Sequence, residues 1–294
     1  MGGTLRITAA VVFVLVILAG SLSETLDAMS WPSEEAVLIH NFGYNENGRP
    51  VLGMIFSGET QVLAAENGEV IFTRGKNNTA SRLPSPLGAW TAVDHGDGLI
   101  SIYSRYNDEP VSVSQVEKSQ PIAFSGISGW STRNGFYFIV FDRRERHWIN
   151  PAMIITPVQR TRLPQILSVN LKNTQEGLTA QPGNLNQGRY TVLVNAVSPA
   201  ITSTAQENFL APQRIVCLVN GAEAGVLNFE AFSARDGVLM VYRNGLVPAK
   251  QVYAAFPAFE AAEVFLTRGQ ANLEILVQDI AGNSRSMVNR LIVN

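Results

Sequence analysis

Residues 128–141 read SGWSTRNGFYFIVF, a glycine-bearing turn that leads directly into an apolar run. The second half, GFYFIVF, is rich in aromatic and β-branched residues, which favour strands. Similar short apolar runs separated by turn residues continue on both sides, and helical periodicity is almost absent. The sequence therefore predicts an antiparallel all-β fold.

Three pairs of neighbouring strands are expected between about residues 36 and 157. VLAAENGEVIF (62–72) places Asn67-Gly68 between two apolar runs, which is a strong hairpin signal. WTAVDHGDGLISIYSRY (90–106) has the same form, with a turn at Gly96 to Gly98. PIAFSGISGW (121–130) followed by GFYFIVFD (135–142) predicts the third pair. We assign residues 36–157 to one β domain.

A second β domain is predicted over residues 166–294, after a polar, proline-containing linker at 158–165. About seven short strands with Gly and Asn turns are typical of an immunoglobulin-like β-sandwich. GRYTVLVNAVSP (188–199) and the ending NLEILVQDIAGNSRSMVNRLIV (272–293) resemble bacterial Ig-like modules. In the final D-x-A-G-N turn, Gly282 and Asn283 are expected to supply positive φ angles. The strands are ILSVNL, GRYTVLVNAV, RIVCLVNG, GVLMVYRNG, AEVFLTRG, NLEILVQD and RLIVN.

The first 23 residues, MGGTLRITAAVVFVLVILAGSLS, have the features of a signal peptide. Arg6 gives a positive start, and the apolar run Ala9 to Ala19 is shorter than the roughly 20 residues of a spanning helix. Cleavage is expected after Ser21 or Ser23, and the alternative is an uncleaved anchor. The sequence thus indicates export, and any membrane contact would be through an uncleaved N-terminal segment.

Charge and cysteine content exclude several classes of protein. The 22 basic and 24 acidic residues give a net charge of −2, which provides no general attraction to nucleic acid or anionic membranes. Cys217 is the only cysteine, so an intrachain disulfide is impossible. A single cysteine in a strand is usually a small apolar core residue.

The N-terminal domain resembles the LytM/M23 peptidase domain, an antiparallel β fold of the duplicated-hybrid-motif type found in zinc endopeptidases of bacterial cell walls. The resemblance extends over most of residues 42–156. It lies in VLGMIFSGETQVLAAENGEVIF (51–72), TAVDHGDGLISIYSRY (91–106), VSVSQVEKSQPIAFSGISGWST (111–132), NGFYFIVF (134–141) and INPAMII (149–155).

The resemblance also implies where the family's catalytic groups would lie. The first ligand His falls on Val51 and the ligand Asp on Ile55. The catalytic His of Tyr-x-His falls on Arg105, and the His-x-His pair falls on Gly135 and Tyr137. Two histidines at i and i+2 of a strand reach one ion because they point to the same face. None of the five positions holds His or Asp, so we expect a pseudo-peptidase with no metal and no cofactor.

The three histidines of the chain offer no replacement, since none has a His-x-His or His-Glu-x-x-His spacing. His95 in DHGDG (94–98) is expected to bond the backbone in a hairpin turn, and the alternative is a metal ligand. His40 and His147 lie near the two ends of the domain, where they have too few donors around them for a new metal site.

Six residues are candidates for binding: Tyr103, Arg105, Trp130, Tyr137, Arg143 and Arg144. Arg105 could bind a carboxylate in the former catalytic cleft. Its alternative is an ion pair with Asp94 or Asp108. The aromatic residues could line a groove or pack in the core. The arginines of DRRERHW (142–148) could contact an anionic polymer or form a solvated hairpin tip.

The resemblance implies a non-catalytic protein of the bacterial periplasm or cell envelope. Its function would be to regulate cell-wall hydrolases or to act as a scaffold that binds peptidoglycan or an envelope protein. One alternative is an active zinc endopeptidase of peptidoglycan whose site has gone unrecognised. The other is a structural assembly protein that binds a partner through a groove or a sheet edge.

Overall fold

The structure, a computed structural model, describes residues 28–46, 49–76, 84–107, 109–155, 162–199, 209–254 and 257–294. Within these ranges it is almost entirely β, which confirms the predicted fold class, and two 3-10 turns, η1 (Pro151–Met153) and η2 (Ala249–Gln251), are its helical elements. No helix in these ranges is long and apolar enough to span a bilayer. The predicted signal peptide and residues 158–161 of the predicted linker lie outside the described residues.

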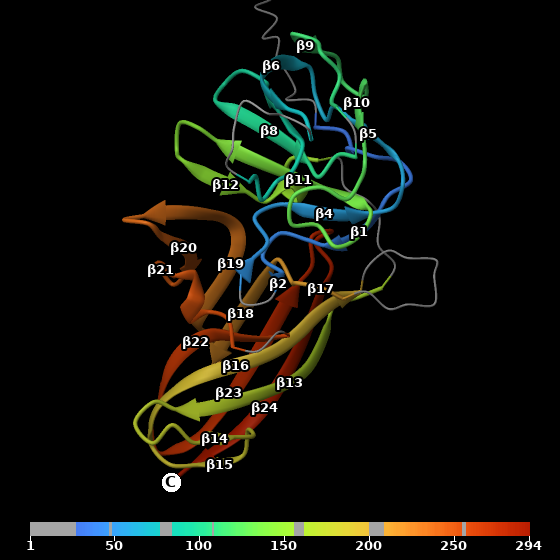
Figure 1. The fold of residues 1–294 in the computed structure, drawn as a ribbon. Helices are drawn as coiled ribbons and strands as arrows, with labels where there is room; N and C mark the ends of the chain where they lie inside the picture. The colour runs from blue at the N-terminus through green and yellow to red at the C-terminus, as the bar shows by residue number, and fades with distance from the viewer. Residues whose placement is uncertain are drawn as a thin grey trace, which may run out of the picture.

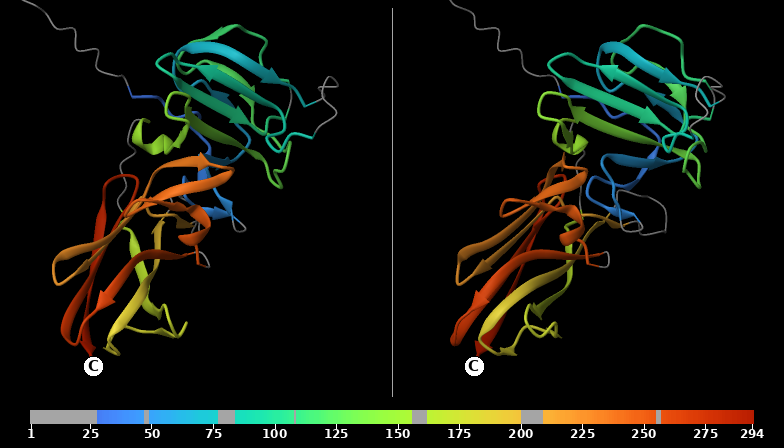
Figure 2. Two further views of the ribbon diagram at one scale, coloured as in Figure 1. Left: turned by 90° about the vertical axis from the view of Figure 1, so that its left-hand side faces the viewer. Right: turned by 60° about the vertical axis from the view of Figure 1, so that its left-hand side comes forward.

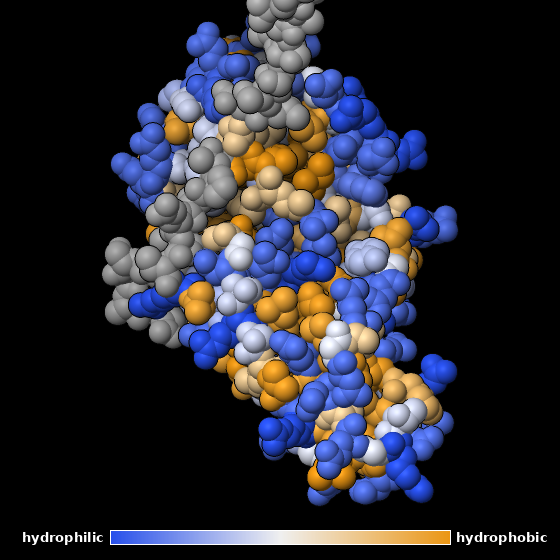
Figure 3. Space-filling model, turned by 180° about the vertical axis from the view of Figure 1, so that it is seen from behind, coloured by the Kyte–Doolittle hydropathy of each residue, from blue (hydrophilic) through white to orange (hydrophobic). Residues whose placement is uncertain are grey.

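Two domains are stacked end to end, and the C-terminus lies at the far end of the second one (Figures 1 and 2). Each has its own apolar core. The predicted boundaries at residues 36–157, 158–165 and 166–294 remain our proposal for dividing the chain. Seen from behind, apolar side chains gather in the middle of the upper domain and in bands across the lower one (Figure 3).

The strand GFYFIVFD is central to the first domain. This strand, β11 (Gly135–Asp142), pairs with β4 at its beginning, with β8 over most of its length and with β12 at its end, always antiparallel. Most of its side chains are buried, and because they alternate between the two faces of the sheet, both faces of β11 are covered. The other strands of the sheet are β1 (Val37–His40), β4 (Met54–Ser57), β6 (Gly68–Arg74), β7 (Trp90–Asp94), β8 (Leu99–Ser104), β9 (Gln115–Val116) and β12 (His147–Ile149).

One of the three predicted strand pairs is confirmed. β7 and β8 form the hairpin around Gly96 to Gly98. The other two predictions are wrong, although their strands exist. β5 (Gln61–Leu63) pairs with β10 (Pro121–Phe124), whereas β6 pairs with β7 and β9. The turn at Asn67 therefore moves the chain from a small two-stranded sheet to the large one. Likewise β10 does not pair with β11, and an isolated bridge joins Gly126, two residues after β10, to Gly135 of β11.

The second domain is a sandwich of two facing sheets, the Ig-like architecture that the sequence predicted. The first sheet contains β13 (Gln165–Asn173), β14 (Thr179–Ala180), β16 (Gly188–Pro199), β17 (Phe209–Leu210) and β22 (Ala258–Leu266). The second contains β15 (Asn184–Leu185), β18 (Arg214–Val219), β19 (Ala222–Arg235), β20 (Val238–Arg243), β21 (Leu246–Pro248), β23 (Gly269–Gln278) and β24 (Ser284–Val293). Cys217 is fully buried between them, and burial raises the pKa of its thiol to about 12. It is thus an apolar core residue, as predicted.

The turn between β23 and β24 has the form expected of D-x-A-G-N, with one correction. Gly282 has a φ of 84°, whereas Asn283 is not among the residues of positive φ. The side chain of Asp279 stabilises the turn at Asn283 instead. Its carboxylate accepts hydrogen bonds from the backbone N–H groups of Ala281 and Asn283 at 2.8 and 2.9 Å. An Asp that bonds its own turn in this way removes the need for a second positive φ.

The longest strand, β19, was not predicted, and it joins the two domains. Its first half pairs with β18 inside the sandwich. Further along, Ala231, Phe232 and Ser233 pair with β12 of the first domain, so the main sheets of the two domains are continuous (Figure 1). Strand pairing fixes relative orientation through backbone hydrogen bonds, so the two domains form one structural unit.

Candidate functional site

The positions predicted to correspond to the family's zinc ligands come together in the structure. Val51 and Ile55 are buried in one small apolar cluster with Ile39, and Tyr137 packs against it. Strand register explains this, because Ile55 on β4 is opposite Tyr137 on β11, and Tyr137 is opposite Ser104 at the end of β8. Arg105 follows Ser104 directly. We call Val51, Ile55, Arg105 and Tyr137, together with His40, Tyr44 and Glu46, the candidate site.

Gly135, two residues before Tyr137 on β11, leaves no room for a side chain. A Cβ at this position would collide with the carbonyl oxygen of Phe56 on the neighbouring strand β4. The backbone φ of 159° also favours glycine. A histidine ligand at residue 135 therefore does not fit this arrangement of strands.

Arg105 occupies the position expected for the catalytic histidine and is held in an uncommon backbone conformation. Its φ is 74°, and its N–H donates to the carbonyls of Leu87 and Ala89, both at 2.9 Å. Its guanidinium lies over the ring of Tyr137, 5.1 Å from the ring centre, which is cation–π geometry. Its Nε is buried, without a hydrogen-bond partner among the described residues. Burial lowers the pKa of Arg105, and Glu46 opposes this effect.

The hydroxyl of Tyr137 fixes the loop that carries Val51. It accepts a hydrogen bond from the backbone N–H of Leu52 at 2.9 Å. Burial raises the pKa of this phenol, so it remains a neutral hydrogen-bonding group at any physiological pH. The hydroxyl of Tyr137 therefore holds the loop through Leu52, while the guanidinium of Arg105 lies over its ring.

The remaining residues of the site are His40 at the end of β1, Tyr44 directly before β2, and Glu46 in the hairpin β2–β3 (Asn45–Glu46 and Arg49–Pro50). The rings of His40 and Tyr44 are stacked, 3.9 Å apart and 9° from parallel. His40 Nδ1 lies 3.6 Å from Glu46 Oε1. Burial lowers the pKa of His40, Glu46 opposes this, and Arg133 and Arg105 reinforce it. The site thus combines an apolar floor with half-buried polar groups of both signs.

The hairpin β2–β3 was not predicted from the sequence. His40 was considered only as a possible metal ligand, and Tyr44 and Glu46 had no predicted role. The dipeptide Asn47-Gly48 is a hairpin signal that would have indicated β2 and β3. Two-residue strands are too short to show an alternating pattern, which is why periodicity did not find them.

The structure brings together three of the six predicted binding residues. Trp130 is 64% exposed, and the guanidinium of Arg49 on β3 lies 5.9 Å from its ring centre, which places it beside the hairpin of the candidate site. Arg105 and Tyr137 are in the site itself. Tyr103 is fully buried, so any effect it has on binding is indirect. Its hydroxyl accepts a bond from the N–H of Ala65 at 2.7 Å, and burial raises its pKa to about 12.

Arg143 and Arg144 lie elsewhere, just past the far end of β11. Arg143 pairs with Asp94 at 3.3 Å, and Arg144 lies 3.8 Å from Asp142. The predicted alternative of an ion pair between Arg105 and Asp94 is therefore wrong, because Asp94 is at the opposite end of β7 and has Arg143 as its partner. Asp108 lies outside the described residues. Arg143 also lines an open polar groove with His95 and Glu117.

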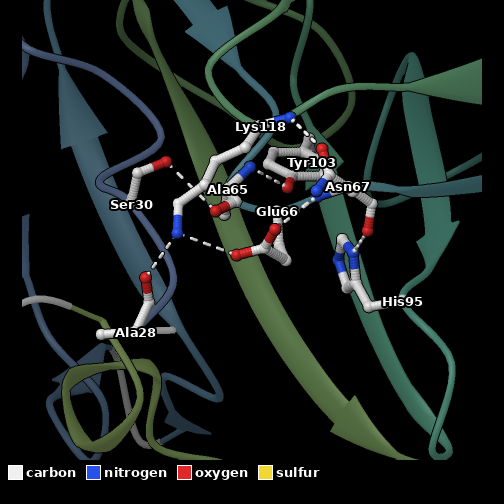
Figure 4. A network of polar contacts seen from close by, with 8 residues as sticks. All are labelled: Ala28, Ser30, Ala65, Glu66, Asn67, His95, Tyr103 and Lys118. Atoms are coloured by element: carbon white, nitrogen blue, oxygen red, sulfur yellow. Dashed lines mark hydrogen bonds and ion pairs between the residues drawn. The ribbon is translucent and has the colours of Figure 1, made fainter. Parts of the chain in front are cut away.

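His95 contacts the backbone, as predicted. Its Nδ1 lies 2.7 Å from the carbonyl oxygen of Asn67, and its Nε2 lies 2.7 Å from Ser101 Oγ. A carbonyl can only accept, so Nδ1 carries the proton and Nε2 accepts from the serine. The same network contains Lys118, which binds Glu66 at 2.9 Å and the carbonyl of Ala28 at 2.8 Å (Figure 4). It ties the start of the described chain to the turn before β6.

We expect two half-buried histidines, His40 and His95, to make stability depend on pH. Burial lowers the pKa values of both His40 and His95 from the ordinary value of 6.5. The unfolded chain therefore binds protons more readily than the folded protein as the pH falls below about 6.5. The associated stability is fully present above that pH and is lost as the pH falls through the folded-state values. Urea denaturation at pH 8 and pH 5.5 measures the effect.

The variant His95→Gln should show a smaller loss of unfolding free energy between pH 8 and pH 5.5 than the wild type. His147→Gln, a half-buried histidine on β12, serves as the control for removing a histidine. If the pH dependence of stability in His95→Gln were the same as in the wild type, His95 would not be a source of that dependence.

The donor set of the candidate site does not suit zinc. Zinc in proteins is held by Cys, His and carboxylate ligands in a tetrahedron. Around Tyr137 and Ile55, His40 and Glu46 are the only such side chains of the site as defined, and they contact one another. Across the described residues, no group of three or more His, Cys, Asp and Glu side chains is placed to hold a metal ion.

Comparison with known proteins identifies the class of the first domain. Residues 52–151 match the model of Peptidase family M23, and a second family model, which has no functional description, matches residues 163–294. The first domain is therefore M23-like, and it is joined to an Ig-like β-sandwich.

A curated relative matches over part of its length. The murein hydrolase activator EnvC of Escherichia coli (strain K12) is 32% identical over 136 residues, which cover 45% of this chain and 30% of EnvC. The chain thus spans less than a third of that relative.

Solved structures with weak overall similarity include two peptidases. The catalytic domain of a variant of the prophage-encoded M23 protein EnpA from Enterococcus faecalis is 18% identical, covering 42% of this chain and 94% of that one, with a TM-score of 0.35. Lysostaphin from Staphylococcus simulans is 16% identical, covering 81% and 99%, with a TM-score of 0.32. The assignment to the M23-like class rests on the sequence match.

Proposed function

We propose that this protein is a non-catalytic component of the bacterial cell envelope whose M23-like domain has lost its zinc site. In this role it regulates a cell-wall hydrolase or binds peptidoglycan or an envelope protein through the candidate site. Export by the N-terminal segment, and hence a periplasmic or envelope location, is part of the same proposal.

The apolar character of the candidate site is the observation that carries the proposal. Where an M23 peptidase would present ligands and a water molecule, this chain packs Val51 and Ile55 at 4% and 3% exposure against Tyr137. A hydrolytic zinc site needs about three protein ligands and an open position for water. A buried aliphatic floor supplies neither, which supports a non-catalytic role.

The candidate site still has groups that can bind a ligand, above all Arg105. Arg105 is half-buried, lies over an aromatic ring and has an Nε without a partner among the described residues. An arginine in such a setting suits a carboxylate, because its planar guanidinium gives two parallel hydrogen bonds. The exposed Trp130 nearby adds a flat surface for a sugar or peptide group. The relative EnvC is a murein hydrolase activator, which supports a regulatory role for this chain.

The proposal predicts no zinc-dependent hydrolysis by the purified protein. The residue 24–294 protein is incubated with excess zinc and isolated peptidoglycan sacculi, the sacculi are sedimented, and both fractions are assayed. We expect no muropeptide fragments and less than one equivalent of tightly bound zinc. Released fragments together with stoichiometric zinc would support the alternative of an active endopeptidase.

The same sedimentation distinguishes the ways of binding. If the protein sediments through the candidate site, Arg105→Ala should weaken its affinity for sacculi about tenfold or more, since hydrogen bonds to charged groups contribute about 1.5–3 kcal/mol. Arg143→Ala, at the far end of β11, should not. Equal sedimentation of both variants would indicate a contact elsewhere, such as a sheet edge. Protein that stays in the supernatant would point to a protein partner, which a pull-down from envelope extracts would then identify.

A further inference from the structure

The segment His40–Tyr44 contributes to both domains. His40 and Tyr44 stack on one another in the candidate site. The three residues between them, Asn41, Phe42 and Gly43, all contact the C-terminal sandwich. The site and the sandwich thus share one short piece of backbone, and neither can shift without the other.

The contacts on the sandwich side are buried and specific. Asn41 donates to the carbonyl of Ala211 at 2.9 Å and accepts from the N–H of the same residue at 2.8 Å. Both residues are fully buried. Phe42 is also fully buried, within the core of the sandwich, 5.1 Å between ring centres from Phe232. These contacts fix the chain just after His40.

Gly43 is clamped by two aromatic residues of the sandwich. A Cβ on Gly43 would lie 2.7 Å from the ring of Phe229, so only glycine allows this approach. The carbonyl of Gly43 accepts a hydrogen bond from the hydroxyl of Tyr253 at 2.7 Å. The rings of Phe229 and Tyr253 are themselves stacked, 6.0 Å apart.

A run of hydrogen bonds then leads from Gly43 into the candidate site. The N–H of Gly43 donates to the carbonyl of Val51 at 2.9 Å, and the N–H of Val51 donates to the carbonyl of Tyr44 at 2.8 Å. The next residue, Leu52, donates its N–H to the hydroxyl of Tyr137. Tyr253 is thus connected to Tyr137 through bonds that each hold part of the site.

We propose that the C-terminal sandwich is a positioning element for the candidate site, and that Tyr253 is a positioning residue for it. Through Gly43, Tyr253 sets the placement of Tyr44, Val51 and Leu52. A ligand or partner that displaces Tyr253 would loosen the site, and a ligand in the site would in turn tighten the contact, since such coupling is reciprocal. The coupling between Tyr253 and the candidate site does not depend on the proposed function. A regulatory use of this coupling rests on the proposed function.

Tyr253→Phe in the full residue 24–294 protein tests this inference. The substitution keeps the ring and removes only the bond to Gly43. Tyr190→Phe is the matched control, because the hydroxyl of Tyr190 donates to the carbonyl of Asn186 at 2.8 Å, also within the sandwich but away from Gly43. The readouts are amide hydrogen exchange at Gly43, Val51 and Leu52, and the NMR chemical shifts of the His40 ring.

In Tyr253→Phe we expect exchange at these three amides to become about tenfold faster, the order of effect of one lost buried hydrogen bond, and the His40 resonances to shift. Tyr190→Phe should leave both readouts unchanged. Unchanged exchange in Tyr253→Phe, or an equal change in Tyr190→Phe, would overturn the inference. Neither readout requires a ligand, so failure here leaves the proposed function standing, and failure of the sedimentation assay leaves this result intact.

Discussion

Phe42→Ala should lower the free energy of unfolding by about 3–5 kcal/mol, the cost typical of removing a fully buried phenylalanine. The ring comes from the first domain but lies in the core of the second, against Phe232 and close to Phe229. Its loss leaves a cavity beside Phe232 of β19, and this strand cannot move in to fill it because it is paired with both β12 and β20. Urea denaturation followed by tryptophan fluorescence and circular dichroism measures the change.

The same experiment tests whether the two domains unfold together. Because β12 pairs with β19 and Phe42 bridges the cores, the two signals should share one transition in the wild type. Phe265→Ala, at a position 57% exposed, is the control and should change stability by no more than about 0.5 kcal/mol. A loss below about 1 kcal/mol in Phe42→Ala would show that the ring is not part of the core.

Gly135→Ala is expected to destabilise the protein by about 3 kcal/mol or more, because overpacking adds to backbone strain. The added Cβ meets the carbonyl oxygen of Phe56, a backbone atom fixed in the middle of a sheet. A histidine introduced at residue 135 would face the same obstacle, so Gly135→His should lose stability instead of gaining a metal.

Gly183→Ala provides a closely matched control. Gly183 has a φ of 155°, against 159° for Gly135, but nothing lies within 4 Å of the position of its Cβ. It should therefore show the backbone strain alone, of order 1 kcal/mol. Equal losses of unfolding free energy in the two variants would mean that β4 and β11 do not pack as closely as described.

Phe42 and Gly135 concern packing, and their variants report on the arrangement of strands. The sedimentation assay with Arg105→Ala concerns binding by an M23-like domain. The variant Tyr253→Phe tests the connection between the C-terminal sandwich and the candidate site.

Much of the strand content was predictable because it depends on local chemistry. GFYFIVFD and the strands after residue 166 show apolar runs bounded by turn residues, and they form strands as predicted. Partner choice was less predictable. Asn67-Gly68 marks a turn correctly, but β5 and β6 belong to different sheets, since pairing is decided by segments far away in the sequence.

The sequence by itself determined the all-β class, the likeness to the M23 domain and the absence of His or Asp at the five aligned positions, because these depend only on residue identity and spacing. Tertiary structure decided the rest. It gathered Val51, Ile55 and Tyr137 into one cluster, added His40, Tyr44 and Glu46, and buried Phe42 in the neighbouring domain. Contacts between residues up to 210 positions apart, such as Tyr253 with Gly43, depend on how whole sheets stack, and no local pattern encodes that.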